Sequence, residues 1–163
     1  MMVRILFLIV FGLTGLIRAA EWAESYRSAK NQAIRQNKKI LIFFSGSDWC
    51  EAGRQLSRDL FRSKSFQELA SRQYVLYNAD FPKYSRLGQE TEERNKRLAA
   101  RYGIHRFPAI VVAEPKFGSL LVKQVGLTNM TSRQLLDKLA KIEKETARSG
   151  SQPKNRPAGK TVP

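Results

Sequence analysis

The clearest pattern in the chain is a short run of consecutive apolar residues within Lys39 to Ser45, whose sequence is KILIFFS. Such a run is too short for a buried helix, and it lacks the alternation of a half-exposed strand. It therefore predicts a central strand that is buried on both faces. Tyr74 to Asn78 and Ala109 to Ala113 predict two further strands, and Leu120 to Val125 is predicted to pair with the latter as a hairpin.

Between these runs the apolar residues recur every three or four positions, which is the period of a helix. Helices are predicted over Glu21 to Asn37, Trp49 to Phe61, Ser65 to Arg72 and Glu92 to Tyr102, and a last helix begins at the capping box Thr131 to Gln134. Strand–helix–strand crossovers join parallel strands, whereas the hairpin is antiparallel. The order therefore predicts the α/β class, with a mixed four-stranded sheet and helices on both faces.

Three polar or small residues are predicted to mark helix ends. Ser47 and Asp48 supply side-chain oxygens just before Trp49, and such oxygens commonly cap a helix N-terminus. Gly103 follows Tyr102, where a glycine commonly ends a helix.

The two ends of the chain differ in composition from the part between them. Residues 1–20 contain Arg4, an apolar run from Ile5 to Ile17 and two small residues, which is typical of an export signal. The run is shorter than the roughly 20 residues that span a bilayer, although an uncleaved anchor is the alternative. Residues 149–163 contain three prolines and no aromatic residue, so a disordered basic tail is expected. A single domain over 21–148 remains, in a periplasmic or secreted protein.

The chain is strongly basic, with 29 Lys and Arg against 14 Asp and Glu and a net charge of +15 over 163 residues. This charge predicts attraction to anionic surfaces. On the last predicted helix the lysines alternate with acids, which is typical of a solvated helix face. No alternation of basic and aromatic residues marks a nucleic-acid platform. An anionic surface of the cell envelope is therefore favoured over nucleic acid as a charged partner.

The chain has one cysteine, Cys50, which excludes an internal disulfide, a cysteine-rich zinc site and an internal dithiol pair. Cys50 lies between the predicted central strand and a helix, where free N–H groups and the helix dipole favour a thiolate. Arg54 would favour the thiolate, and Asp48 and Glu51 would oppose it. The polar neighbours favour an exposed sulfur over a buried one.

Metal and cofactor chemistry find no support in the sequence. His105 is the only histidine, and one histidine with one cysteine does not make a metal-ligand cluster. A catalytic pair of Cys50 and His105 is disfavoured because no third group is indicated to orient the imidazole. His105 is therefore expected to be an ordinary loop histidine, with neither metal nor cofactor bound.

The strand, the stretch from Gly46 to Cys50 (GSDWC), the helix after it and the distant Phe107-Pro108-Ala109 together resemble the thioredoxin family. They resemble in particular secreted bacterial thioredoxin-like proteins and disulfide isomerases, over nearly all of Glu21 to Ile142. The resemblance implies a thioredoxin-like fold in which a cis-proline, Pro108, packs against the active cysteine. It also implies that Trp49, Phe107 and Pro108 line a groove for a substrate peptide.

The chain departs from this family at two positions that matter for chemistry. The family motif Cys-x-x-Cys is Cys50-Glu51-Ala52-Gly53 here, so Gly53 occupies the position of the resolving cysteine. The buried carboxylate of the preceding strand is also missing, because Ile42, Phe43 and Phe44 fill that segment. Without a second thiol the chain does not complete a dithiol cycle alone.

Two functions remain open for this arrangement. The first is thiol–disulfide exchange or isomerisation of protein substrates through Cys50, with a small thiol or a partner's thiol completing turnover. The second is a non-catalytic module that binds client or partner proteins through the same groove. An odd cysteine in an exported chain also allows a covalent dimer through Cys50.

Overall fold

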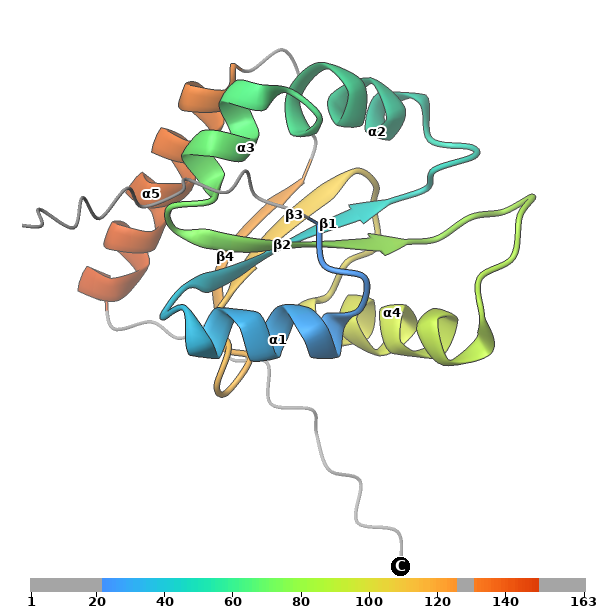
Figure 1. Ribbon diagram of the computed structural model, residues 1–163, viewed down its shortest axis with the longest axis horizontal. Coiled ribbons are helices and arrows are strands. Elements are labelled where there is room, and N and C mark those ends of the chain that lie inside the picture. The colour runs from blue at the N-terminus through green and yellow to red at the C-terminus, as the bar shows by residue number, and fades with distance from the viewer. Residues whose placement is uncertain (1–21, 126–130, 150–163) are drawn as a thin grey trace, which may run out of the picture.

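The computed structural model describes residues 22–125 and 131–149 (Figure 1). The elements in chain order are α1 (Tyr26–Arg35), β1 (Lys39–Ser45), α2 (Glu51–Leu56), the π-helical turn η1 (Ser57–Phe61), α3 (Lys64–Ala70), β2 (Tyr74–Asp80), α4 (Gln89–Tyr102), β3 (Ala109–Ala113), β4 (Leu120–Val125) and α5 (Ser132–Ser149).

The strands form one mixed sheet in the order β2-β1-β3-β4. β1 pairs in parallel with β2, and β3 is antiparallel to both β1 and β4. In this register Ile42 lies beside Tyr77 on one side and Val111 on the other. The predicted α/β class and mixed four-stranded sheet are confirmed, and β1 is an inner strand whose residues are buried from Ile40 to Ser45.

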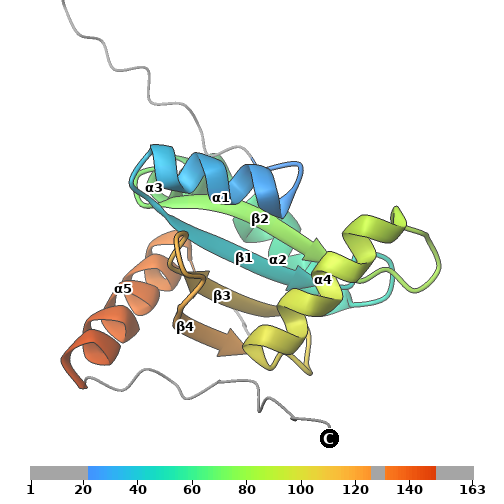
Figure 2. The same ribbon diagram turned by 90° about the horizontal axis from the view of Figure 1, so that it is seen from below.

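Helices cover both faces of the sheet, as predicted (Figure 2). Alternate residues of β1 point to opposite faces, because side chains along a strand alternate. Leu41 and Phe43 belong to a core shared with α2, η1, α3 and α5. Ile42 and Phe44 belong to a second core shared with α1 and α4. This two-sided burial explains why the whole strand is apolar.

The first helix is shorter than predicted. It begins at Tyr26 because Ser25 caps it, with the Ser25 hydroxyl accepting a hydrogen bond from the Ser28 N–H at 3.1 Å. Trp22 was predicted to lie within this helix, and this was wrong. Trp22 instead forms an isolated parallel bridge with Leu76 of β2, and its ring packs edge-on against Phe61 at 5.5 Å.

The second predicted helix is also different in detail. The continuous helix expected from Trp49 to Phe61 is α2 followed by the π-helical turn η1, in which the Arg62 N–H bonds to the Ser57 carbonyl at 3.0 Å. The N-cap residue is Cys50, and neither Ser47 nor Asp48 caps it. Both of those side chains bind elsewhere, as described below.

Other predicted ends fall close to the observed ones. Gly103 ends α4 with φ of 60°, in the left-handed region that favours glycine. The capping box at α5 is present, since the Thr131 N–H donates to Gln134 Oε1 at 2.9 Å and the Gln134 N–H donates to Thr131 Oγ1 at 3.2 Å. α4 begins three residues before the predicted Glu92, and β2 continues two residues beyond Asn78.

The predicted export signal, residues 1–20, lies outside the described residues, and so do residues 150–163 of the predicted tail. Over 22–125 and 131–149, no helix has both the length and the apolar content needed to cross a membrane.

Candidate functional site

Cys50 lies at the carboxyl end of β1 and begins α2 as its N-cap residue. The preceding turn is closed by the Cys50 N–H, which donates to the Gly46 carbonyl at 2.8 Å. The expectation of an exposed sulfur was wrong, because Cys50 is buried with a relative exposure of 8%. The residue therefore keeps only a narrow opening to solvent.

Gly53 adjoins both Cys50 and Pro108. A β-carbon placed on Gly53 would lie 3.4 Å from Cys50 Sγ and 3.8 Å from Pro108 Cβ. The first turn of α2 and the loop before β3 thus meet around the sulfur. The peptide bond between Phe107 and Pro108 is cis. The structure brings Cys50, Gly53 and Pro108 together although Pro108 is distant in the sequence.

Aromatic rings form the surface beside Cys50. The Trp49 ring meets the Phe107 ring edge-on, with centroids 5.7 Å apart, and Phe107 in turn contacts Phe81 at 5.1 Å. Trp49 is 42% exposed, and Tyr84 on the neighbouring loop is 76% exposed. An apolar surface therefore lies next to the cysteine, and Trp49 and Phe107 are both part of it.

Trp49 is held in place by a hydrogen bond and by a missing side chain. Its Nε1–H donates to the Phe81 carbonyl at 2.7 Å. Its indole covers Gly46, where a β-carbon would lie only 2.3 Å from the ring. Gly46 is therefore required for this ring position, because any larger residue would push the indole away.

Two carboxylates join the loops of the site, Asp80, which was not predicted to lie there, and Asp48, which was predicted only as a helix cap and a charge near Cys50. Asp80, at the end of β2, accepts hydrogen bonds from the Ser47 N–H at 2.9 Å and the Ser45 hydroxyl at 3.0 Å. Asp48 accepts from three successive N–H groups, at residues 83–85, each at 2.8 Å. The loop before Cys50 is thus tied to the loop after β2. A carboxylate directly after a strand, among turn residues, was the available sequence signal.

The Asp48 carboxylate is strongly held in its charged form. Desolvation acts to raise the pKa of Asp48, but the N–H groups of Lys83, Ser85 and Tyr84 outweigh it and lower the pKa from the usual 3.8 to about 2. The loop contact therefore persists well below neutral pH.

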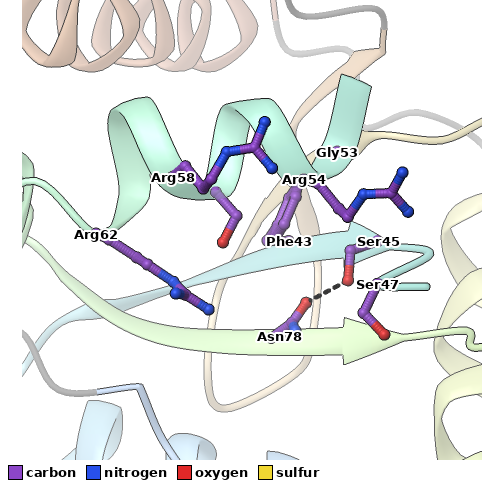
Figure 3. Close-up of a pocket in the computed structure, with 9 residues that line it drawn as sticks. Phe43, Ser45, Ser47, Gly53, Arg54, Arg58, Arg62 and Asn78 are labelled. Carbon is purple, nitrogen blue, oxygen red and sulfur yellow. Dashed lines mark hydrogen bonds between the residues drawn. The ribbon is translucent and has the colours of Figure 1, made fainter. Parts of the chain in front are cut away.

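A pocket of about 290 Å³ lies between α2 and β2 (Figure 3). Phe43 lines it from β1, in the segment where the family resemblance led us to look for a buried acid. The remaining lining residues are polar, apart from Gly53, and three are arginines: Ser45, Ser47, Gly53, Arg54, Ser57, Arg58, Arg62 and Asn78.

His105 stands apart from the cysteine. It is exposed in the connection between α4 and β3, and no hydrogen bond among the described residues joins it to Cys50. Within the same residues, no three His, Cys, Asp or Glu side chains are grouped so as to hold a metal ion.

The chain is similar to several known proteins. A family model described as the thioredoxin-like domain matches residues 26–142. The disulfide bond reductase DsbH of Chlamydia pneumoniae is 31% identical over 91 residues, which are 56% of this chain and 54% of that protein. The chain thus spans about half the length of this relative.

Solved structures show the same architecture. A DsbH oxidoreductase has a TM-score of 0.69 at 25% identity, over 78% of this chain and 86% of that one. A disulphide isomerase from Xylella fastidiosa has a TM-score of 0.54 at 26% identity, over 75% and 93%. A thioredoxin from Thermus thermophilus, 16% identical over 85% and 98%, shares the fold with a TM-score of 0.59. Because the family match includes the whole sheet, Cys50 and the Pro108 loop, this chain belongs to the thioredoxin-like family.

Proposed function

We propose that the protein carries out thiol–disulfide exchange or isomerisation on protein substrates, with Cys50 as the nucleophile. The observation that carries this proposal is the position of Cys50, at the start of α2 and beside Gly53, which also adjoins Pro108. Two similar proteins, a disulfide bond reductase and a disulphide isomerase, support the same chemistry.

The reaction begins with the Cys50 thiolate attacking one sulfur of a substrate disulfide. The substrate S–S bond breaks, a new bond forms between Cys50 and the attacked sulfur, and the other substrate sulfur leaves as a thiolate. In isomerisation, a different substrate thiolate then attacks the mixed disulfide and releases the Cys50 thiolate, with no net oxidation or reduction. In net reduction, two external thiols become a disulfide while the substrate disulfide becomes two thiols.

Because residue 53 is a glycine, the thiol that releases Cys50 from the mixed disulfide must come from another molecule. A glycine has no sulfur to attack the mixed disulfide, and Cys50 is the only cysteine of the chain. A small thiol or a partner's thiol therefore completes net reduction. The exposed Trp49 and half-buried Phe107 supply apolar surface on which a substrate segment near its disulfide would lie.

The proposed location is the periplasm or the outside of the cell, where disulfides form and persist. This rests on the export signal expected over residues 1–20. The net charge of +15 would attract such a protein to anionic envelope surfaces. A covalent dimer through Cys50 also stays a prediction, and the intact mass of protein isolated without reductant tests it.

The decisive experiment is reactivation of a substrate protein with scrambled disulfides, in the presence of a small thiol. Wild-type protein should accelerate recovery of the native disulfides, and Cys50→Ser should lose the acceleration while keeping its circular dichroism and melting temperature. Equal rates with and without wild-type protein would overturn the proposed activity.

The burial of Cys50 favours a second candidate, a non-catalytic module that binds client proteins through the same surface. Only 8% of Cys50 is exposed, whereas the adjacent Trp49 is 42% exposed and presents a large apolar area. In this case Trp49→Ala should weaken binding of an unfolded, cysteine-free client, and Cys50→Ser should leave the binding unchanged. Equal binding by wild-type protein and Trp49→Ala would overturn this second function.

A further inference from the structure

Neither proposed function involves the arginine-lined pocket between α2 and β2. Its volume of about 290 Å³ suits a small ligand group rather than a peptide segment. Figure 3 shows Arg62 extending from the end of the helical segment toward β2, opposite Ser45 and Asn78. One wall is therefore cationic and the other carries neutral polar groups.

The π-helical turn helps to place the three arginines on one wall. Four residues of an α-helix make slightly more than one turn, so Arg58 is displaced around the axis from Arg54. In η1 the Arg62 N–H bonds five residues back, to Ser57, so each turn is wider and four residues make less than one turn. The second displacement opposes the first and returns Arg62 toward the same wall.

Two nearby acids, Glu51 and Asp80, offset part of the charge of the three arginines that line the pocket. Arg54 and Arg58 both bind the Glu51 carboxylate, and the hydrogen bonds from these two arginines lower the pKa of Glu51. Asp80 adds one negative charge behind Ser45. Among the described residues, no carboxylate lies within ion-pair distance of Arg62, which leaves its guanidinium available to a ligand.

The opposite wall adds a directed donor. The single proton of the Ser45 hydroxyl is shared between Asn78 Oδ1 at 2.8 Å and Asp80 Oδ1 at 3.0 Å, and the contact with Asn78 places its amide oxygen toward β1. The Nδ2–H₂ group of Asn78 then has no acceptor among the described residues. A guanidinium on one side and an amide donor on the other suit an oxyanion with several acceptor oxygens.

We propose that this pocket binds a phosphate-type oxyanion, held by Arg62 from the end of the helical segment and by Asn78 from β2. The phosphate group comes either from a soluble phosphate compound or from an anionic lipid headgroup. The basic character of the whole chain, +15, raises the local concentration of both. The pocket and the cysteine are separated only by Gly53, which lines the pocket and also adjoins Cys50 Sγ.

The test uses inorganic pyrophosphate as the soluble probe, at constant ionic strength maintained with chloride. Binding is followed by calorimetry and by the Nε–Hε nuclear magnetic resonance signals of the arginines. Arg62→Gln and Asn78→Asp should each weaken binding about tenfold, the loss expected for a charge-assisted contact or for an added repulsion. Arg72→Gln is the matched control, since it removes one exposed positive charge outside the pocket.

Vesicles of phosphatidylglycerol and of phosphatidylcholine identify the source of the phosphate. Weaker sedimentation of Arg62→Gln than of Arg72→Gln with phosphatidylglycerol assigns a lipid headgroup and supports the site. Equal sedimentation of the two variants, together with their different affinities for pyrophosphate, assigns a soluble ligand and also supports it. The proposal is overturned if Arg62→Gln and Arg72→Gln behave alike toward both probes, because general charge attraction then explains all binding.

Discussion

At the scale of single residues, the site depends on the absence of a side chain at two glycines, Gly46 and Gly53. Gly46 leaves room for the Trp49 indole, and Gly53 leaves room beside Cys50 Sγ. The first controls the position of an aromatic ring on the exposed surface. Gly53 supplies no resolving thiol, but its backbone lies where the β-carbon of a cysteine would face Cys50. This placement is directly testable.

Gly53→Cys should restore a dithiol pair. A β-carbon at residue 53 would lie 3.6 Å from Cys50 Cβ, within the range of about 3.5–4.5 Å that a disulfide requires. We expect oxidised Gly53→Cys to form an internal disulfide and to gain dithiol reductase activity, measured by thiol titration and by reduction of a protein disulfide. Gly53→Ser is the control. A variant that keeps two free thiols under mild oxidation would contradict the described placement of residue 53.

Gly46→Ala should displace Trp49, since its methyl group would overlap the indole ring. The ring then loses its hydrogen bond to the Phe81 carbonyl. We expect a red-shifted tryptophan emission and weaker client binding, with the Gly88→Ala variant unaffected because nothing adjoins that position within 4 Å. Unchanged emission in Gly46→Ala would place the ring elsewhere.

Asp48→Asn should destabilise the protein in a pH-dependent way. The folded-state pKa of Asp48 is about 2, below its usual 3.8, so the charged carboxylate contributes stability above about pH 4. This contribution is lost as the pH falls from about 4 to 2. The difference in free energy of unfolding between wild type and Asp48→Asn, measured in urea, should therefore shrink over that interval. A difference that stays constant between pH 5 and pH 2 would show that the charge is not the cause.

Local rules succeeded where the partners of a residue are close in the sequence. Gly103 and the Thr131–Gln134 capping box were predicted correctly because their hydrogen bonds lie within a few residues. Asp48 was wrongly predicted as a cap because the N–H groups that it accepts from belong to residues 83–85. The burial of Cys50 was missed for the same reason, since Pro108 comes from a distant loop.

At the scale of elements, strands were easier to predict than helix ends. β3 and β4 have the predicted bounds, because a short apolar run and a turn define each of them. α1 and α4 follow the N-cap residues Ser25 and Gly88, which the apolar pattern does not distinguish from neighbouring residues that could also precede a helix. The interruption of α2 by η1 had no signal in the apolar pattern, since Leu56 and Leu60 suit an unbroken helix.

The position of α5 can be tested with two leucines. Leu139 is fully buried against α3 and the sheet, whereas Leu136 is only partly buried. Leu139→Ala should lower the free energy of unfolding by about 2–5 kcal/mol, the usual cost of such a cavity, and Leu136→Ala should lower it less. Both values come from urea unfolding monitored by circular dichroism. Equal costs for the two variants would contradict the described face of α5.

At the scale of the whole molecule, the sheet separates two faces and brings their loops to one end. β1 leads to Cys50, β2 leads to Asp80 and the loop that binds Asp48, and β3 begins beside Pro108. Because β3 runs antiparallel to β1, its start meets the end of β1. This topology, rather than any one motif, assembles the cysteine, the aromatic surface and the arginine pocket around α2.

The central proposal is that Cys50 reacts with disulfides although the fold covers most of the residue. The most direct measurement is the rate at which Cys50 reacts with a small uncharged disulfide, dipyridyl disulfide, at pH 6, in folded protein and in urea. A functional nucleophile predicts that the folded protein reacts about tenfold faster than the unfolded chain. A folded protein that reacts more slowly than the unfolded chain would contradict the claim and leave Cys50 as an inert core residue.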